Sequence, residues 1–261
     1  MLLPIGIFAY AISMAIFPTL TSLASTKRMK EFKKTFSLGL RAIVYITVPA
    51  AVGLMIVGVP IVRLLFEQGK FNQRDTIVTA SVLFYYCIGL FAQASVFVIV
   101  RGFYALHDTK TPLQLGLFTI TCNYLLNHLF IGYLGVRGLA LAYSITGVLD
   151  MLALLYLLRR KIGQLGLKKI LSSCLKILVA ALGMGISAYL LTYNFETLIP
   201  VNRKVVQLIE VAVVLGVSAG IYLGITLLLK MEEVDMVIGV FTRRLKPGKP
   251  TFGKEQTGHR G

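Results

Sequence analysis

The sequence predicts an all-α polytopic membrane protein with about seven transmembrane helices. Of its 261 residues, 56% are hydrophobic and 15% are charged, and the mean hydropathy is +0.78. A soluble domain carries roughly a quarter charged residues. The apolar residues also stand in continuous blocks of about twenty, the length that a helix needs to cross roughly 30 Å of hydrocarbon. Strands of a membrane barrel would instead alternate in hydrophobicity over about ten residues.

Seven apolar blocks mark the predicted spans in chain order. They cover Met1 to Ala24, Leu38 to Val59, Thr76 to Val100, Pro112 to Ile131, Val136 to Leu158, Ser172 to Tyr193 and Val205 to Leu229. The first block starts inside its own apolar stretch, with neither a basic region ahead of it nor a small-residue cleavage site. We therefore expect the chain to be the C-terminal part of a longer transporter, and its first span to be an internal helix.

The segments between the spans divide the chain into four predicted regions. Residues 1–158 form a lobe of five helices, with a short interfacial helix at residues 60–71 that a glycine turn closes. A basic linker at residues 159–171 leads to a separate pair of spans at residues 172–229. Residues 230–261, rich in glycine, proline and lysine, form a cytoplasmic tail that is predicted to be partly disordered.

The net charge of +16 is concentrated in alternate loops. Lysine and arginine gather between the first two spans, in the basic linker and in the tail, whereas the intervening loops carry few. This asymmetry is typical of the positive-inside rule and places the C-terminus in the cytoplasm. Nucleic-acid binding is disfavoured because no aromatic-basic platform accompanies the charge. The three cysteines lie within spans and lack the spacing of a disulfide framework or a metal site.

Two charged residues inside predicted spans are candidate functional residues, because charge within a bilayer is costly. Arg41 lies in the first turn of the second span. There it can snorkel to the basic interface, or face a central cavity and bind a phosphate or pyrophosphate group. Asp150 lies eight residues before Arg159, about 12 Å from the interface at helical rise. A hydrogen bond between helices and a cavity-lining role are both open for it.

Amides and glycines form two further sets of candidates. Asn123 and Asn127 are four residues apart and share one face of the fourth span, where their amides can bridge helices or offer oxygens to a small cation. In the last span, Gly216, Gly220 and Gly224 form a small-residue ridge that allows close helix approach. We expect this ridge to pack against the sixth span. Beside lipid, the same ridge can cradle an acyl or prenyl chain.

The turn between the third and fourth spans is the most informative part of the sequence. It runs Arg101-Gly102-Phe103-Tyr104-Ala105-Leu106-His107-Asp108-Thr109-Lys110-Thr111-Pro112. Thr111-Pro112 is a helix-start signal, a capping hydroxyl followed by a proline at the first helical position, and the Asp108 carboxylate can bond free amides in the preceding turn. The turn either only joins two helices, or it forms a gate or headgroup contact through Arg101, Asp108 and Lys110.

Residues 103–112 resemble the F-Y-A-x-x-D-T-(K/R)-T-P signature of the MurJ (MviN) family of lipid II flippases. Weaker stretches agree in order and spacing: L-P-I-G-I-F at residues 3–8 with F-P-T-L at residues 17–20, and P-A-A-V-G-L at residues 49–54 with L-F-E-Q-G-K-F at residues 65–71. The resemblance covers nearly the whole chain apart from the tail.

The resemblance implies a full protein of fourteen helices, with two lobes around a cavity, within the multidrug/oligosaccharidyl-lipid/polysaccharide exporter superfamily. This chain would then be helices eight to fourteen, and the first lobe with its cavity arginines would lie outside it. Some members of the family are thought to hold a sodium ion with an amide and an acid four residues apart. Asn123 matches the amide, but Asn127 stands in place of the acid.

We therefore predict part of a lipid II flippase of the bacterial cytoplasmic membrane, which moves an undecaprenyl-pyrophosphate-linked muropeptide by alternating access. Its expected partners are lipid II, membrane lipids and a first lobe. The sequence contains no nucleophile–base pair, P-loop or metal cluster, so we expect no enzymatic activity and no cofactor. A sodium ion or the membrane potential is the candidate driving force. The alternatives are a polysaccharide or multidrug exporter of the same superfamily, and a truncated fragment without transport.

Overall fold

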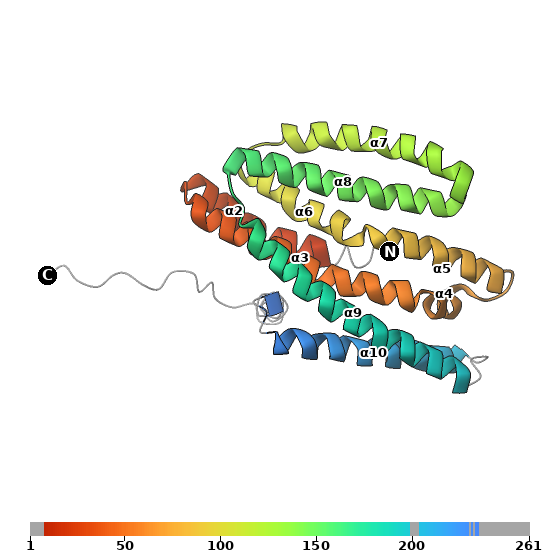
Figure 1. The fold of residues 1–261 in the computed structure, drawn as a ribbon. Helices are drawn as coiled ribbons and strands as arrows, with labels where there is room; N and C mark the ends of the chain where they lie inside the picture. The colour runs from red at the N-terminus through yellow and green to blue at the C-terminus, as the bar shows by residue number, and fades with distance from the viewer. Residues whose placement is uncertain (1–7, 199–203, 230, 232, 235–261) are drawn as a thin grey trace.

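The computed structural model describes residues 8–198, 204–229, 231, 233 and 234, and the chain is helical through nearly all of them (Figure 1). The helices are α2 (Tyr10–Ser25), α3 (Met29–Ile56), α4 (Gly58–Phe66), α5 (Gln73–Ile88), α6 (Leu90–Ala105), α7 (Lys110–Leu134), α8 (Val136–Ile162), α9 (Leu167–Leu198) and α10 (Lys204–Leu228). Five of them are long and apolar enough to cross a membrane, and α5 and α6 together form a sixth candidate span, bent by 42°. The predicted class, an all-α polytopic membrane protein, is confirmed.

The predicted spans fall on these helices in order. The second, fourth, fifth, sixth and seventh blocks lie on α3, α7, α8, α9 and α10. The third block is divided between α5 and α6, a break that the apolar pattern did not indicate. The first block lies partly on α2, and its first seven residues are outside the described part of the chain.

The bend between α5 and α6 lies at Gly89, where α8 packs closely. A Cβ atom added to Gly89 would lie 2.5 Å from Ser144 Cα, so a larger residue would push the two helices apart. The Ser144 hydroxyl donates to the carbonyl oxygens of Tyr85 and Tyr86, at 2.6 and 3.2 Å. Carbonyls beside the bend are therefore bonded across helices, as buried backbone groups in a bilayer must be.

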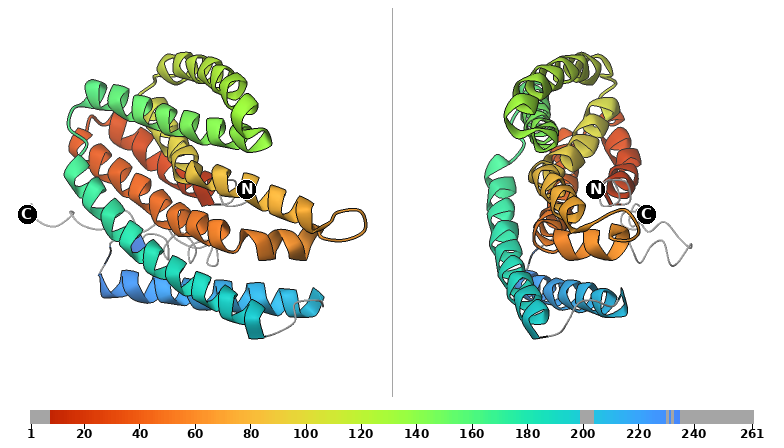
Figure 2. Two further views of the ribbon diagram at one scale, coloured as in Figure 1. Left: turned by 45° about the vertical axis from the view of Figure 1, so that its right-hand side comes forward. Right: turned by 90° about the vertical axis from the view of Figure 1, so that its right-hand side faces the viewer.

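The helices form a bundle with a packed middle and two outer pairs (Figures 1 and 2). At one edge, α7 lies against α8. The middle consists of α2, α3, α5 and α6, where large side chains such as Phe32, Phe36, Phe103 and Ile43 are fully buried. At the other edge α9 packs along α3 and then meets α10. Of all these helices α7 is the most exposed, because none of its residues is buried.

The connection between α8 and α9 is shorter than the predicted linker at residues 159–171. The α8 helix continues through its basic last turn to Ile162, and α9 already begins at Leu167. Lysine and arginine are good helix formers and interact favourably with a helix C-terminus. Gly163 and Gly166 supply the turn, with φ of 81° and 71°, a region that glycine adopts without strain.

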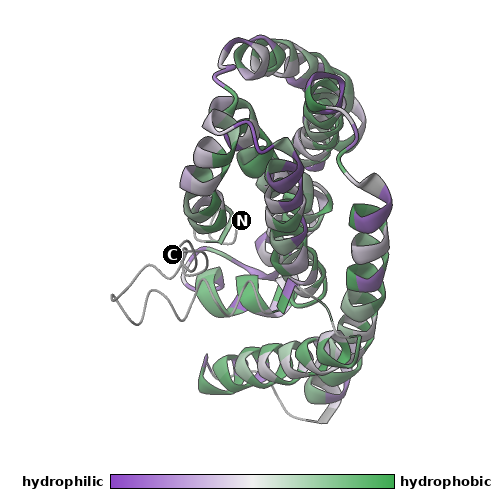
Figure 3. Ribbon diagram, turned by 90° about the vertical axis from the view of Figure 1, so that its left-hand side faces the viewer, coloured by the Kyte–Doolittle hydropathy of each residue, from purple (hydrophilic) through white to green (hydrophobic). Residues whose placement is uncertain are grey.

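Hydrophilic residues gather at the turns of the chain rather than along the helices. Figure 3 looks onto the end of the bundle where α9 begins, and shows hydrophilic residues at the start of α9 and in several turns. The short helix α4 (Gly58–Phe66) takes the place of the interfacial helix predicted at residues 60–71, and Gly69, with φ of 62°, lies in the turn that follows it. The predicted tail is described only at Met231, Glu233 and Val234, all three of them buried.

Candidate functional site

The turn between α6 and α7 is a well-defined corner. The α6 helix ends at Ala105, and His107, two residues later, lies in the left-handed region, at φ of 58°. The amide of His107 donates to the carbonyl oxygen of Tyr104, and the amide of Asp108 donates to that of Phe103, both at 3.0 Å. This pair of hydrogen bonds is the Schellman arrangement, usually built on glycine. The sequence signature thus specifies a fixed reversal of the chain.

Asp108 lies two residues before α7 and bonds the first turn of that helix. Its carboxylate accepts a hydrogen bond from the Thr111 amide at 3.0 Å and one from the Thr111 hydroxyl at 2.7 Å. The prediction that the Thr111 hydroxyl would cap α7 was therefore wrong, because this hydroxyl donates to Asp108 instead. The carboxylate is the better acceptor for the free amides at a helix start.

Asp108 also ties the corner to α8. The Lys161 ammonium lies 2.7 Å from the Asp108 carboxylate. Partial desolvation of the carboxyl raises its pKa, but the hydrogen bonds from Lys161 and Thr111 outweigh this and lower the pKa of Asp108 to about 2. Asp108 is thus ionised at neutral pH and engaged by two neighbours, and its proposed contact with a substrate headgroup remains a prediction.

The other two candidates in this corner differ in their surroundings. The Arg101 guanidinium lies over the ring of Phe17 in α2, 5.3 Å from its centroid, and 6.0 Å from that of Tyr104. Such contacts hold a cation against an aromatic face while leaving its outer edge available. Lys110 is exposed at the start of α7. Arg101 and Lys110 remain candidate headgroup contacts.

Arg41 lies inside the protein, 4% exposed, rather than extended to an interface. Its guanidinium donates to the Glu233 carboxylate at 2.7 Å and to the Ser173 hydroxyl at 3.1 Å, and Ser173 donates to the same carboxylate oxygen at 2.7 Å. We call this set the Arg41 junction. It joins α3, α9 and the segment after α10, and both charges are almost fully buried. Of the two roles weighed for Arg41, snorkelling is wrong, and phosphate binding remains a prediction.

A second polar contact lies next to the Arg41 junction, between α3 and α10. The Tyr222 hydroxyl donates to the carbonyl oxygen of Tyr45 at 2.7 Å, and the two rings lie 5.3 Å apart. The Tyr45 hydroxyl lies 3.0 Å from that of Thr226. Neither Glu233 nor this tyrosine pair was singled out in the sequence. Tyrosines within spans were a usable signal, because buried hydroxyls need partners.

A polar seam follows the contact between α7 and α8. The Thr119 hydroxyl donates to Asp150 at 3.1 Å, which confirms the hydrogen bond between helices as one of the two roles weighed for Asp150. One turn away the Asn123 amide donates to Thr146 at 3.2 Å, and the Asn127 amide donates to Asn123 at 2.9 Å. Asn123 and Asn127 thus share a face as predicted, and Asn123 bridges α7 to α8.

The same seam contains the predicted cation site at Asn123 and Asn127. Asn127 Oδ1 is buried, and among the described residues it has no hydrogen-bond partner. Its neighbours on the seam are neutral, and the Asp150 carboxylate is occupied by Thr119 one turn further on. Affinity for a cation rises with the charge of its oxygen ligands. A site of neutral oxygens therefore fits a sodium ion poorly.

The small-residue ridge of α10 differs from the prediction. A Cβ atom added at Gly216, Gly220 or Gly224 would meet no atom of the described residues within 4 Å, so within this part of the chain the ridge faces outward and does not pack against α9. Spacing alone cannot tell which face of a helix meets protein. In α9, a Cβ atom at Gly185 would lie 2.9 Å from Val52 of α3, whereas one at Gly183 would lie 3.0 Å from Ile225 of α10. A role of the ridge in holding a lipid tail remains a prediction.

Membrane-length helices, held together by buried polar contacts, define a polytopic helical membrane protein. In the described part of the chain no group of three or more metal-binding side chains occurs. The family model "Lipid II flippase MurJ" matches residues 1–208. The chain therefore belongs to the MurJ family.

Relatives and a solved structure agree with this assignment. The chain is 34% identical over 153 residues to a probable lipid II flippase MurJ of Vibrio cholerae, covering 59% of this chain and 29% of that protein. It is 27% identical over 248 residues to that of Rhizobium tropici, covering 95% of this chain and 46% of the relative. A solved structure of lipid II flippase MurJ, in an inward closed conformation, superposes with a TM-score of 0.70 at 28% identity, over 87% of this chain and 44% of that one. The chain thus spans less than half the length of these proteins.

Proposed function

We propose that this chain is part of a flippase that moves lipid II, an undecaprenyl-pyrophosphate-linked muropeptide, across the bacterial cytoplasmic membrane. The observation that carries the proposal is the superposition on a lipid II flippase over 87% of the chain, together with the family match over residues 1–208. No bond is made or broken in such a step, so the chain would not act as an enzyme.

Alternating access requires one lobe to move as a unit against another. The contacts described above suit a unit of this kind. Asp108 and Lys161 hold the α6–α7 corner to α8, and the Arg41 junction holds α9 and the segment after α10 to α3. The partner in this motion would be a first lobe, whose presence in the working protein is part of the proposal. Ties of this kind would let the helices rock together.

The orientation in the membrane is part of the same proposal. The basic turns at Lys27 to Lys34 and Arg159 to Lys169 lie at one end of the bundle, as the contact between Lys33 and the α8–α9 turn supports. The positive-inside rule would place this end, and the C-terminus, in the cytoplasm. Arg101 and Lys110 would then face arriving headgroups from the inner leaflet.

The driving force is a separate proposal with two candidates, a sodium gradient and the membrane potential. The neutral oxygens around Asn123 and Asn127 favour the membrane potential, which supplies about 2.3 kcal/mol per unit charge per 100 mV. Replacing external sodium by an organic cation while the potential is held constant would separate them. Transport that is unaffected by this replacement supports the potential.

The proposed function is tested by complementation in a bacterium depleted of its own lipid II flippase. The chain is expressed alone and together with a first lobe from a related flippase, and lipid II in the outer leaflet is measured. Rescue only in the presence of the first lobe is the expected result. Rescue by the chain alone would contradict the two-lobe mechanism. Failure of both, with both pieces stably inserted, would overturn the flippase proposal in favour of an exporter or a fragment without transport.

A further inference from the structure

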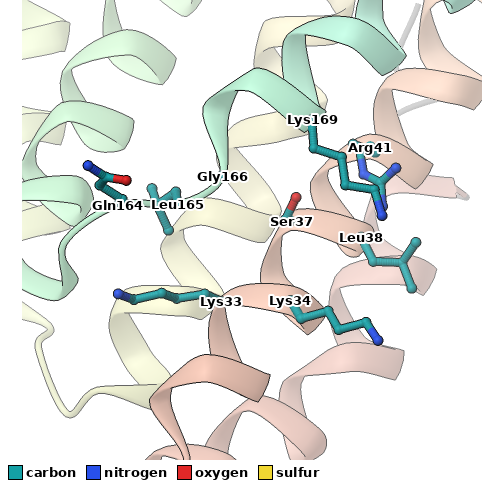
Figure 4. A pocket seen from close by; sticks show the side chains of 9 residues that line it. All are labelled: Lys33, Lys34, Ser37, Leu38, Arg41, Gln164, Leu165, Gly166 and Lys169. Atoms are coloured by element: carbon teal, nitrogen blue, oxygen red, sulfur yellow. The ribbon is translucent and has the colours of Figure 1, made fainter.

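A hollow lined by basic residues lies where α3 passes the α8–α9 turn (Figure 4). It has a volume of about 200 Å³. We call it the basic hollow, and its polar lining consists of Lys33, Lys34, Ser37, Arg41, Gln164 and Lys169. No carboxylate is among the described residues that line it. Arg41 is neutralised by Glu233, so the excess positive charge on the α3 side of the hollow comes from Lys33 and Lys34.

The two lysines on α3 are placed on either side of the basic hollow. Lys33 extends toward Gln164 and the α8–α9 turn, and its ammonium would lie 3.4 Å from a Cβ atom at Gly163. Lys34 extends along the opposite side (Figure 4). Neither lysine forms an ion pair with the described carboxylates. The α9 helix also begins at this place, and a helix N-terminus favours an anion. Charge and shape together suit a phosphate group.

An apolar groove of about 450 Å³ lies beyond the basic hollow along the same two helices. Its walls include Leu40, Val44 and Val48 of α3 and Ile170, Cys174 and Leu178 of α9. The hollow and the groove have no lining residue in common, but Leu40 directly precedes Arg41 and Ile170 directly follows Lys169, so the two lie next to each other along both helices. Further walls come from α5, α6 and α8. Leu178 is 47% exposed, so this wall of the groove lies at the surface of the bundle.

The polarity and the length of the groove suit a hydrocarbon chain. Its one hydroxyl, that of Ser95, already donates to the carbonyl oxygen of Phe91 at 2.7 Å. The groove reaches from Leu40 to Met55 on α3, about 22 Å at helical rise. This exceeds half the thickness of a roughly 30 Å hydrocarbon core, so one chain of a lipid from a single leaflet can lie along it.

We propose that the basic hollow and the apolar groove together bind an anionic phospholipid, with its phosphate headgroup between Lys33, Lys34 and Lys169 and one acyl chain between α3 and α9. The lipid would come from the leaflet at the basic end of the bundle. It would fasten α9 to α3 beside the Arg41 junction. This binding site stands on geometry alone and does not depend on the proposed transport activity.

The test measures which lipids stay bound to the full chain in nanodiscs of phosphatidylglycerol and phosphatidylcholine with identical acyl chains. Native mass spectrometry then counts the retained lipids. We expect preferential retention of phosphatidylglycerol. The double variant Lys33→Gln/Lys34→Gln should lower this preference by about tenfold, given the attraction of each basic residue for anionic headgroups. A matched variant, Lys30→Gln/Lys168→Gln, removes two exposed charges at the same end outside the hollow and should leave the preference unchanged.

The groove is tested separately by narrowing it. Leu178→Trp, at a partly exposed wall, and Val48→Phe, on the facing helix, should each reduce retention of both lipids severalfold. Leu178→Trp keeps the test valid if Val48→Phe does not fold. Equal losses in the hollow variant and its matched control would overturn the proposal in favour of diffuse surface charge. Displacement of the lipid by millimolar inorganic phosphate, with no effect of the groove variants, would show a site for soluble anions instead. Preferential retention of added undecaprenyl pyrophosphate over phosphatidylglycerol would also overturn it.

Discussion

Asp108 has two structural tasks in the corner between α6 and α7. Its carboxylate bonds the Thr111 amide at the start of α7, and it pairs with Lys161 at the end of α8. Both contacts require the ionised form, because a protonated carboxyl is a poorer acceptor and carries no charge for the lysine. The stability of the corner should therefore depend on pH.

The variant Asp108→Ala tests this role. We expect a loss of about 1 kcal/mol from the weakened cap, and only a few tenths from the pair, because Lys161 is 42% exposed and the pair is screened by water. Thermal unfolding of the purified chain measures the loss. The matched control is Glu31→Gln, which removes an exposed pair with Arg28 and should have little effect.

The pH dependence of Asp108 has a definite sign. The pKa of its carboxyl in the folded protein is about 2, below the value of about 3.9 for an unfolded chain. Its contribution to stability is thus complete above about pH 4 and is lost as the pH falls from about 4 to about 2. Asp108→Ala should flatten this part of the stability curve. An unchanged acid slope in the variant would contradict the assignment.

The sequence predicted single residues well where their partners were local. The F-Y-A-x-x-D-T-K-T-P stretch indicated a capped corner, and Asp108 bonds a residue three positions away. It did not reveal the partner of Arg41, because Glu233 is 192 residues away in the chain and lies in a segment assigned to the tail. The composition of the tail predicts only its average behaviour, and it does not show that a single carboxylate, that of Glu233, docks the segment after α10 against α3.

The helices α9 and α10 are fastened to the rest of the bundle at both ends of α10. At one end the Lys204 ammonium donates to the carbonyl oxygens of Arg63, Leu64 and Glu67, at 3.0 to 3.2 Å. These hydrogen bonds satisfy carbonyl groups at the C-terminus of α4 that have no partner within the helix. At the other end the Arg41 junction holds the segment after α10. Tyr222 bonds Tyr45 between these two points. The pair is thus docked through polar contacts that need matched partners.

A double-mutant cycle tests the Arg41 junction. Arg41→Met or Glu233→Leu alone leaves one buried charge without its counterion and should cost about 3–5 kcal/mol. The double variant should recover most of this loss, because two apolar side chains leave no charge unpaired. The readouts are thermal stability and cleavage by a protease between α8 and α9. Additive losses in the double variant would show that the two residues do not act as a pair.

Substitutions of two glycines distinguish a glycine that is needed for close helix packing from one that only belongs to a small-residue repeat. Gly89→Ala should destabilise the chain, because the new Cβ would lie 2.5 Å from Ser144 Cα and push α8 away from the bend. Gly220→Ala, on the open ridge of α10, should be neutral or stabilising by up to about 1 kcal/mol, the difference in helix propensity. Thermal unfolding compares the two. A loss at Gly220 as large as that at Gly89 would show that the ridge packs against protein.

The hydrophobic blocks of the sequence predicted the helices, but they did not predict which helices contact each other. The lengths of the apolar blocks predicted the helices α3, α7, α8, α9 and α10, and at most ends the bounds agree within a few residues. The sequence did not predict the bend at Gly89, because a glycine within an apolar block does not show that another helix will cross there. The direction of the α10 ridge was wrong for a related reason. In a membrane, lipid and protein offer equally apolar surroundings, so hydrophobicity does not mark the packed face.

At the scale of the whole molecule, the chain forms a helical unit with fixed corners and an outer helix, α7, whose residues are all at least partly exposed. It belongs to the MurJ family and spans less than half the length of the relatives compared. A transport cycle of two lobes would use this unit as one of its moving parts. The polar contacts that fix its shape would then transmit the motion from one end to the other.

The most direct test of the flippase proposal is the movement of lipid II in reconstituted vesicles. The chain and a first lobe are inserted together, and the loss of a fluorescent lipid II from one leaflet is followed by quenching. We predict that the two pieces together accelerate this movement well above protein-free vesicles, and that an undecaprenyl lipid without the pyrophosphate-linked muropeptide moves no faster than before. Equal movement of both lipids, or no acceleration with both pieces inserted, would contradict the account.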